Sequence, residues 1–132
     1  MNEAHATGML IGAYHFARPD LGNDAANEAR YFVSVARKHL KDGYLRPALD
    51  LEEGASLGKV ALSNWVHEWM NTVKSETGVE PIIYVNSNYA SNFLDSSVTE
   101  YDLWIAHWRC DTGTPPNAGI WDNWDFFSIS KF

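Results

Sequence analysis

Two acidic residues, Asp50 and Glu52, stand one residue apart in the segment 47–53 (PALDLEE). Because side chains alternate along a strand, both acids face one side while Leu49 and Leu51 face the other. The acidic side chains are then roughly 6.5–7 Å apart along the strand. Two acids in a confined space repel and lose water, which raises one pKa and keeps a proton available near neutral pH. This is the pairing that glycosidic cleavage requires.

The same D-x-E pattern has a purely structural interpretation. Acids often stand at a solvated strand end, where they cap the following helix. The apolar residues before Asp50 fit a buried parallel strand, whose carboxyl end is where barrel active sites form. Both interpretations stay open at this point.

Polar and aromatic residues also occur in or at the ends of the other predicted strands. Each alone is more often a packing or structural residue than a functional one. Together they suit a sugar-binding cleft, because aromatic faces with hydrogen-bonding edges complement sugar rings. The candidate substrate-binding residues are Tyr14, His15, Tyr84, Trp104, His107 and Trp124.

Other chemistries have less support in the sequence. A zinc ion held by Asp50, His15 and His107 is the one metal site we consider, and we expect neither a metal nor a cofactor. The sequence lacks the G-x-S-x-G motif of a serine hydrolase. Its single cysteine, Cys110, excludes an internal disulfide and a multi-cysteine zinc site.

Composition argues against two classes of partner. The 132 residues carry a formal net charge of −7 and show no cluster of Lys and Arg, which argues against nucleic acid. An acidic surface also suits an anionic membrane poorly, and no segment approaches the roughly 20 apolar residues of a membrane helix. Residues 1–7 do not resemble a signal peptide, so an extracellular substrate would require export by other means.

Hydrophobic spacing predicts alternating strands and helices. We expect strands at residues 9–17, 44–51, 81–85, 103–108 and 121–129, and loops at residues 18–23 and 111–119. Helices are expected at residues 2–7, from Asp24 as N-cap to a stop at Gly43, over 62–73 with Gly78 as C-cap, and at 88–94. This order predicts an α/β fold of parallel strands, either an open doubly wound sheet or a barrel.

Five segments in order resemble glycoside hydrolase family 25, the muramidases or lysozymes. They are residues 12–19 (GAYHFARP), 47–52 (PALDLE), 81–86 (PIIYVN), 103–108 (LWIAHW) and 121–127 (WDNWDFF). Five motifs in order are far more specific than D-x-E alone.

The resemblance implies a cell-wall hydrolase that cleaves the β-1,4 bond between N-acetylmuramic acid and N-acetylglucosamine. Glu52 would be the general acid, and Asp50 would orient the substrate's acetamido group, which could itself attack the anomeric carbon. Tyr84 would support the developing charge, and Trp104 and His107 would shape the cleft. The family occurs in phages, bacteria and some fungi, so the protein would act outside the cell or be delivered by phage lysis.

The resemblance also predicts an incomplete domain. Residues 1–132 match about five of the family's eight strands, as a partial TIM-like barrel that lacks the first two strands and the last. We therefore expect a single partial catalytic domain that completes its sheet with a second copy or with a fragment encoded elsewhere. One or two acidic residues of the family's site would be absent, which puts activity in doubt. The alternatives are a glycan-binding module that has lost its chemistry, and a chitinase-like glycosidase or metal-dependent deacetylase.

Overall fold

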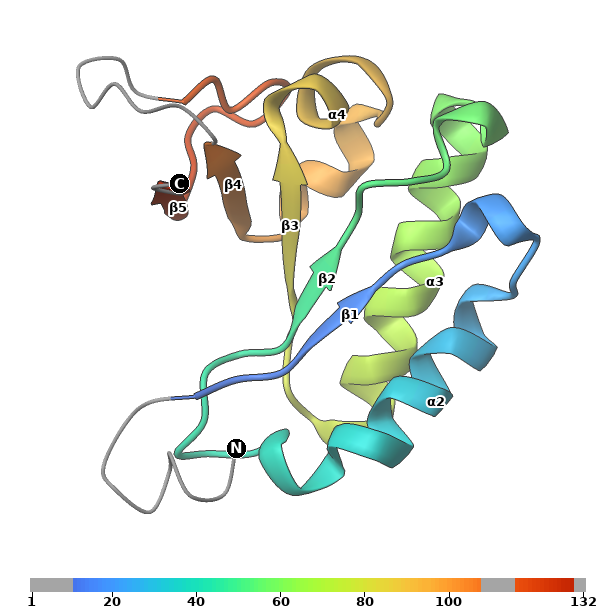
Figure 1. The fold of residues 1–132 in the computed structure, drawn as a ribbon, viewed down its shortest axis with the longest axis vertical. Coiled ribbons are helices and arrows are strands. Elements are labelled where there is room, and N and C mark those ends of the chain that lie inside the picture. The colour runs from blue at the N-terminus through green and yellow to red at the C-terminus, as the bar shows by residue number, and fades with distance from the viewer. Residues whose placement is uncertain (1–10, 108–115, 130–132) are drawn as a thin grey trace.

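The computed structural model describes residues 11–107 and 116–129. These residues form one sheet of five parallel strands in the order β1-β2-β3-β4-β5 (Figure 1). The strands are β1 (Tyr14–Phe16), β2 (Ala48–Asp50), β3 (Ile82–Asn86), β4 (Leu103–His107) and β5 (Phe126–Ile129). Each strand pairs with its neighbour in sequence, as expected for successive strand–crossover–strand units.

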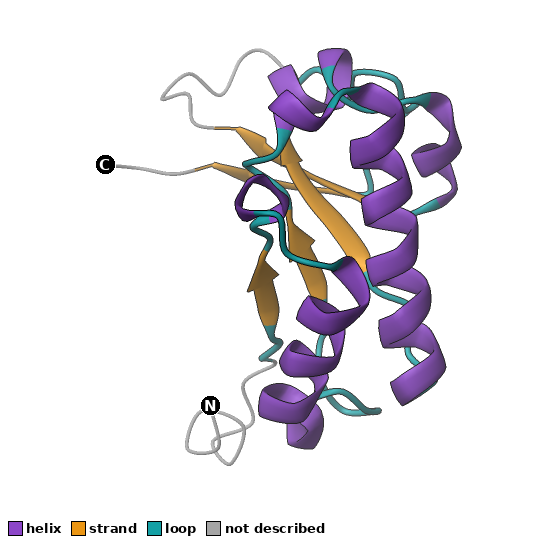
Figure 2. Ribbon diagram, turned by 90° about the vertical axis from the view of Figure 1, so that its right-hand side faces the viewer, coloured by secondary structure: helices purple, strands orange, loops and turns teal. Residues whose placement is uncertain are grey.

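Helices cover one face of this sheet (Figure 2). The α-helices are α2 (Ala25–Ala36), α3 (Lys59–Thr77) and α4 (Ser87–Asn92), and the 3₁₀ turns are η1 (Pro19–Leu21), η2 (Arg37–His39), η3 (Ala55–Leu57) and η4 (Ser96–Glu100). The apolar stripe expected on the longest helix is buried throughout: Leu62, Trp65, Val66, Trp69, Met70 and Val73. That stripe belongs to the same core as Leu49 and Leu51, so these two leucines face the helices as predicted.

The predicted helix boundaries are largely confirmed. The Asp24 side chain accepts a hydrogen bond from the backbone N–H of Asn27 at 3.0 Å, which caps α2. Gly78 ends α3 with φ 74°, a left-handed conformation that favours glycine. The predicted end of this helix at Gly43 is wrong. The α-helix α2 ends at Ala36, and the 3₁₀ turn η2 follows it directly.

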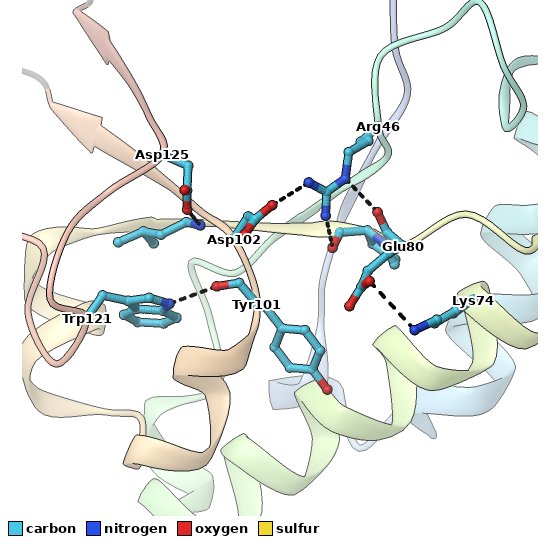
Figure 3. Close-up of polar contacts among 9 residues, drawn as sticks. Arg46, Lys74, Glu80, Tyr101, Asp102, Trp121 and Asp125 are labelled. Carbon is cyan, nitrogen blue, oxygen red and sulfur yellow. Dashed lines mark hydrogen bonds and ion pairs between the residues drawn. The ribbon is translucent and has the colours of Figure 1, made fainter.

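Several predicted strands are too long. The second begins at Ala48 rather than at residue 44, because Pro47 has no N–H with which to extend the ladder. The last begins at Phe126 rather than at residue 121. Trp121 instead anchors a turn, since its buried indole N–H donates to the Tyr101 carbonyl at 2.9 Å (Figure 3).

Some predictions lie outside the described residues. These are the helix at residues 2–7, residues 9–10 of the first strand, most of the loop at 111–119, and Cys110. The described part of the first strand begins at Tyr14, later than expected. In the part of the chain that is described, no helix combines the length and apolarity of a membrane span.

Candidate active site

One row of side chains crosses all five strands on the face that the helices leave uncovered. The strand register pairs these residues in succession, from one edge of the sheet to the other: Phe16, Asp50, Tyr84, Trp104 and Phe126. The residues between them along each strand, such as Leu49, Ile83 and Ile105, are fully buried on the helix side. The row therefore places one acid among four aromatic rings.

Asp50 occupies a desolvated position in this row. It is 8% exposed, and among the described residues its Oδ1 atom has no hydrogen-bond partner. Burial raises the pKa of Asp50 to about 7, and the hydrogen bond that protonated Asp50 donates to the Glu52 side chain and the negative charge of Glu52 add to this shift. The Asp50–Glu52 pair thus holds a proton near neutral pH, as the sequence predicts for two facing acids.

Glu52 lies two residues after the carboxyl end of β2 and is exposed. The backbone turns away directly after it, at Gly54, which has φ 106°. A Cβ atom at Gly54 would lie 2.5 Å from Pro19 Cγ and 2.9 Å from Leu62 Cδ1, so only glycine fits here. This tight turn leaves Glu52 on the rim, next to Asp50 and open to solvent.

The aromatic part of the row is ordered by ring contacts. Tyr84 and Trp104 meet edge to face, with centroids 4.9 Å apart and an interplanar angle of 81°. Trp104 and Phe126 also line a hollow of about 490 Å³ with Tyr44, Leu45, Arg46 and Ile82. Tyr14 lies on the same face, one row nearer the amino ends of the strands, and is 68% exposed.

Arg46 fixes the amino-terminal end of this face (Figure 3). Its guanidinium donates to the Glu80 carbonyl at 2.8 Å, to the Pro81 carbonyl at 3.4 Å and to the Asp102 carboxylate. Nearby, Asp125 receives the backbone N–H of Leu103 at 2.8 Å. These bonds connect the amino-terminal ends of β3, β4 and β5. Arg46, Asp102 and Asp125 therefore have structural roles at the end of the sheet opposite Glu52.

Two predicted site residues, His15 and Trp124, lie away from the row and from the rim that carries Glu52. His15 points to the helix side, where its Nε2 lies 2.6 Å from Glu28 Oε1 and its ring stacks on Trp69 with centroids 5.6 Å apart. Trp124 precedes β5 and packs half-buried against the core, at the amino ends of the strands. We therefore leave His15 and Trp124 out of the proposed cleft.

The position of His15 also excludes the zinc site considered from the sequence. Asp50 and His15 project from opposite faces of adjacent strands, so they cannot share a metal ion. His107 ends β4, and its side chain lies outside the described atoms. Across residues 11–107 and 116–129, no three His, Cys, Asp or Glu side chains form a metal-binding group.

Phe16 and Phe126 are site neighbours that the sequence analysis missed. Alternation along the first strand would have identified Phe16, since it shares a face with Tyr14. Phe126 could not be identified, because the expected start of the last strand was five residues too early.

Comparison with known proteins gives this geometry a context. The family model described as "Glycosyl hydrolases family 25" matches residues 1–131. The chain is 32% identical over 118 residues to the uncharacterized protein YegX of Escherichia coli K12, covering 89% of this chain and 41% of YegX. It is 27% identical over 139 residues to lysozyme M1 of Streptomyces globisporus, covering 97% of this chain and 47% of that enzyme.

The fold is also similar to that of a solved structure. The muramidase from Acremonium alcalophilum superposes with a TM-score of 0.76 at 27% identity, covering 97% of this chain and 65% of that one. The chain therefore spans about half the length of the curated relatives that it matches.

Proposed function

The chain belongs to glycosyl hydrolase family 25, and from this premise we propose that it is a muramidase with Glu52 as its general acid. Its substrate is peptidoglycan, cleaved at the β-1,4 bond between N-acetylmuramic acid and N-acetylglucosamine. The observation that carries the proposal is the Asp50–Glu52 pair, in which one carboxyl is desolvated and the other is open to solvent. A pair of this kind supplies a proton to a leaving sugar oxygen near neutral pH.

Glu52, Asp50 and Tyr84 have different proposed roles in the reaction. Glu52, on the rim, protonates the glycosidic oxygen. Asp50, once ionised, orients the 2-acetamido group of the sugar, whose carbonyl oxygen can attack the anomeric carbon in the substrate-assisted variant of this chemistry. Tyr84 lies beside Asp50 in the register and supports the positive charge that develops on the sugar ring.

Aromatic residues supply the proposed sugar-binding surface. Trp104 and Tyr14 present ring surface on the uncovered face, and Phe16 and Phe126 extend that surface to both edges of the row. Ring faces bind the apolar C–H side of sugars. His107 stays a candidate by its place at the carboxyl end of β4, next to Ile129 in the register. The reaction as proposed uses no metal and no cofactor.

We also propose that the five strands form part of a TIM-like barrel, with residues 1–132 as one partial catalytic domain. The uncovered face carries exposed aromatic side chains, which is unusual for a surface in water. Further strands, from a second copy or from a fragment encoded elsewhere, would pair with the edge strands β1 and β5 and complete the sheet. The domain would act at the cell wall.

Turnover of purified peptidoglycan tests the proposal and separates it from a binding-only module. Wild type is expected to lower the turbidity of a peptidoglycan suspension, and Glu52→Gln to reduce the rate at least about 100-fold, the usual contribution of a general acid. Glycan binding without turnover in the wild type would instead identify a module that keeps the cleft and lacks the chemistry.

A further inference from the structure

Asn86 is the polar residue that directly follows the row on β3. It is the last residue of the strand and stands two positions after Tyr84, so both project from the uncovered face. Val85 between them is fully buried on the helix side. Asn86 therefore lies on the carboxyl-terminal side of Tyr84, toward the rim that carries Glu52.

The amide of Asn86 is held in one orientation. The backbone N–H of Tyr89 donates to Asn86 Oδ1 at 2.9 Å, which caps the first turn of α4. Because a backbone N–H only donates, the atom that faces it has to be the amide oxygen. The nitrogen Nδ2 is then left as a donor, and within the described residues it has no acceptor.

The first turn of α4 lies beside the acidic strand end. Burial raises the pKa of Tyr89, and the negative charges of Glu53, Asp20 and Glu52 act in the same direction. The backbone of Ala55, just after this acidic segment, forms a hydrogen bond with Tyr89. The helix turn that fixes Asn86 is thus the one next to Glu52 and its loop.

We propose that Asn86 is a substrate-positioning residue, whose Nδ2 donates to an oxygen of the N-acetylated sugar bound across the row. The inference rests on the proposed function, since it names a further contact in the same cleft. The acids of this rim carry negative charge, which suits sugar hydroxyl donors. A neutral amide donor supplies the complementary bond to a sugar hydroxyl or acetamido oxygen. Capping alone would be served equally well by Asp or Ser at this position.

The test separates the two roles of Asn86. Asn86→Ser keeps an oxygen that caps α4 and removes Nδ2, whereas Asn86→Ala removes both. Asp24→Ala is the matched control, because it deletes the cap of α2 far from the row. Binding is measured by calorimetry with a tetrasaccharide of alternating N-acetylglucosamine and N-acetylmuramic acid, using Glu52→Gln protein so that no turnover occurs. Melting temperatures are recorded in parallel.

We expect Asn86→Ser to melt like its parent and to bind the tetrasaccharide about 3- to 10-fold more weakly, the effect of one lost neutral hydrogen bond. In the wild-type background, KM should rise by a similar factor while kcat stays within about twofold. Asp24→Ala should melt earlier and bind normally.

Unchanged binding by Asn86→Ser would overturn the inference, even if Asn86→Ala binds weakly, because only the cap would then matter. If the Glu52→Gln protein binds the tetrasaccharide but the wild type never cleaves peptidoglycan, the proposed activity is refuted and the Asn86 comparison stays valid. A parent that does not bind would refute both.

Discussion

Asp50 lies directly opposite Tyr84 in the parallel ladder of β2 and β3, with Phe16 opposite it on the other side. Asp50 is 8% exposed, and this burial is the main reason for its raised pKa. Glu52, by contrast, is open to solvent. The row thus separates a buried acid from an exposed acid only two residues apart.

The buried acid should make stability depend on pH. The pKa of Asp50 is raised from 3.8 to about 7 on folding, so between these pH values the folded protein binds more protons than the unfolded chain. The contribution of Asp50 is fully present below about pH 4 and is lost as pH rises through 7, by at most about 4 kcal/mol. Urea denaturation of wild type and Asp50→Asn from pH 4 to 8 measures this difference. Parallel pH curves for the two proteins would contradict it.

Activity should fall on the alkaline side of neutrality. Once the Asp50–Glu52 pair loses its shared proton, no acid remains for the leaving oxygen. We expect kcat/KM to decline tenfold per pH unit well above pH 7, and Asp50→Asn to displace this limb while lowering the maximum rate. An activity profile that stays flat to pH 9 would show that the pair does not supply the proton.

The chain offers a matched pair for testing the binding face. Tyr14 and Tyr31 are both 68% exposed, but Tyr14 lies on the uncovered sheet face and Tyr31 on helix α2. We expect Tyr14→Ala to weaken co-sedimentation with purified peptidoglycan several-fold, through the loss of ring surface worth about 1 kcal/mol. Tyr31→Ala should bind as wild type does. Equal effects of the two substitutions would place the glycan elsewhere.

Glycine positions test the turn that follows Glu52. Gly54 and Gly43 both have positive φ, of 106° and 92°, but a Cβ would meet atoms only at Gly54. Both alanine variants should lose about 1 kcal/mol from backbone strain, and Gly54→Ala about 1–3 kcal/mol more from overpacking against Pro19 and Leu62. Gly54→Ala should also lose activity, because Glu52 is displaced. Chemical denaturation gives both values, and equal losses would show that the turn tolerates a side chain.

The partly buried pair of His15 and Glu28 should matter for stability rather than for chemistry. Glu28 Oε1 accepts from the backbone N–H of Arg18 at 3.3 Å as well as contacting His15 Nε2, so it joins the end of β1 to α2. His15→Ala should cost about 1–3 kcal/mol of unfolding free energy through lost ring packing and an unsatisfied carboxylate. Its kcat, measured well below the melting temperature, should stay near that of wild type. A 100-fold loss of kcat in a fully folded His15→Ala variant would show that His15 has a role in the active site.

The chemistry of the second strand could be predicted from sequence because alternation is local. Leu49 and Leu51 had to face one way, and Asp50 and Glu52 the other. The apolar stripe of α3 and the helix caps at Asp24 and Gly78 could be predicted in the same way, since each depends on residues within a few positions.

The positions of His15 and Trp124 required tertiary information. His15 follows Tyr14 directly, so one of the two had to face the helices, and only the packing of Trp69 and Glu28 decides which. Trp124 was assigned to a strand that starts later, because the buried Trp121 holds the preceding turn. Register across the sheet, which brings Phe126 beside Trp104, depends on residues far apart in sequence.

The sugar left at the new reducing end shows most directly whether Glu52 drives muramidase cleavage. Purified peptidoglycan is digested with wild type and with Glu52→Gln, and the soluble products are reduced with borohydride and analysed by mass spectrometry. We expect reduced N-acetylmuramic acid in the wild-type digest and none above background with Glu52→Gln. Reduced N-acetylglucosamine as the product, or equal release by the Glu52→Gln protein, would contradict it.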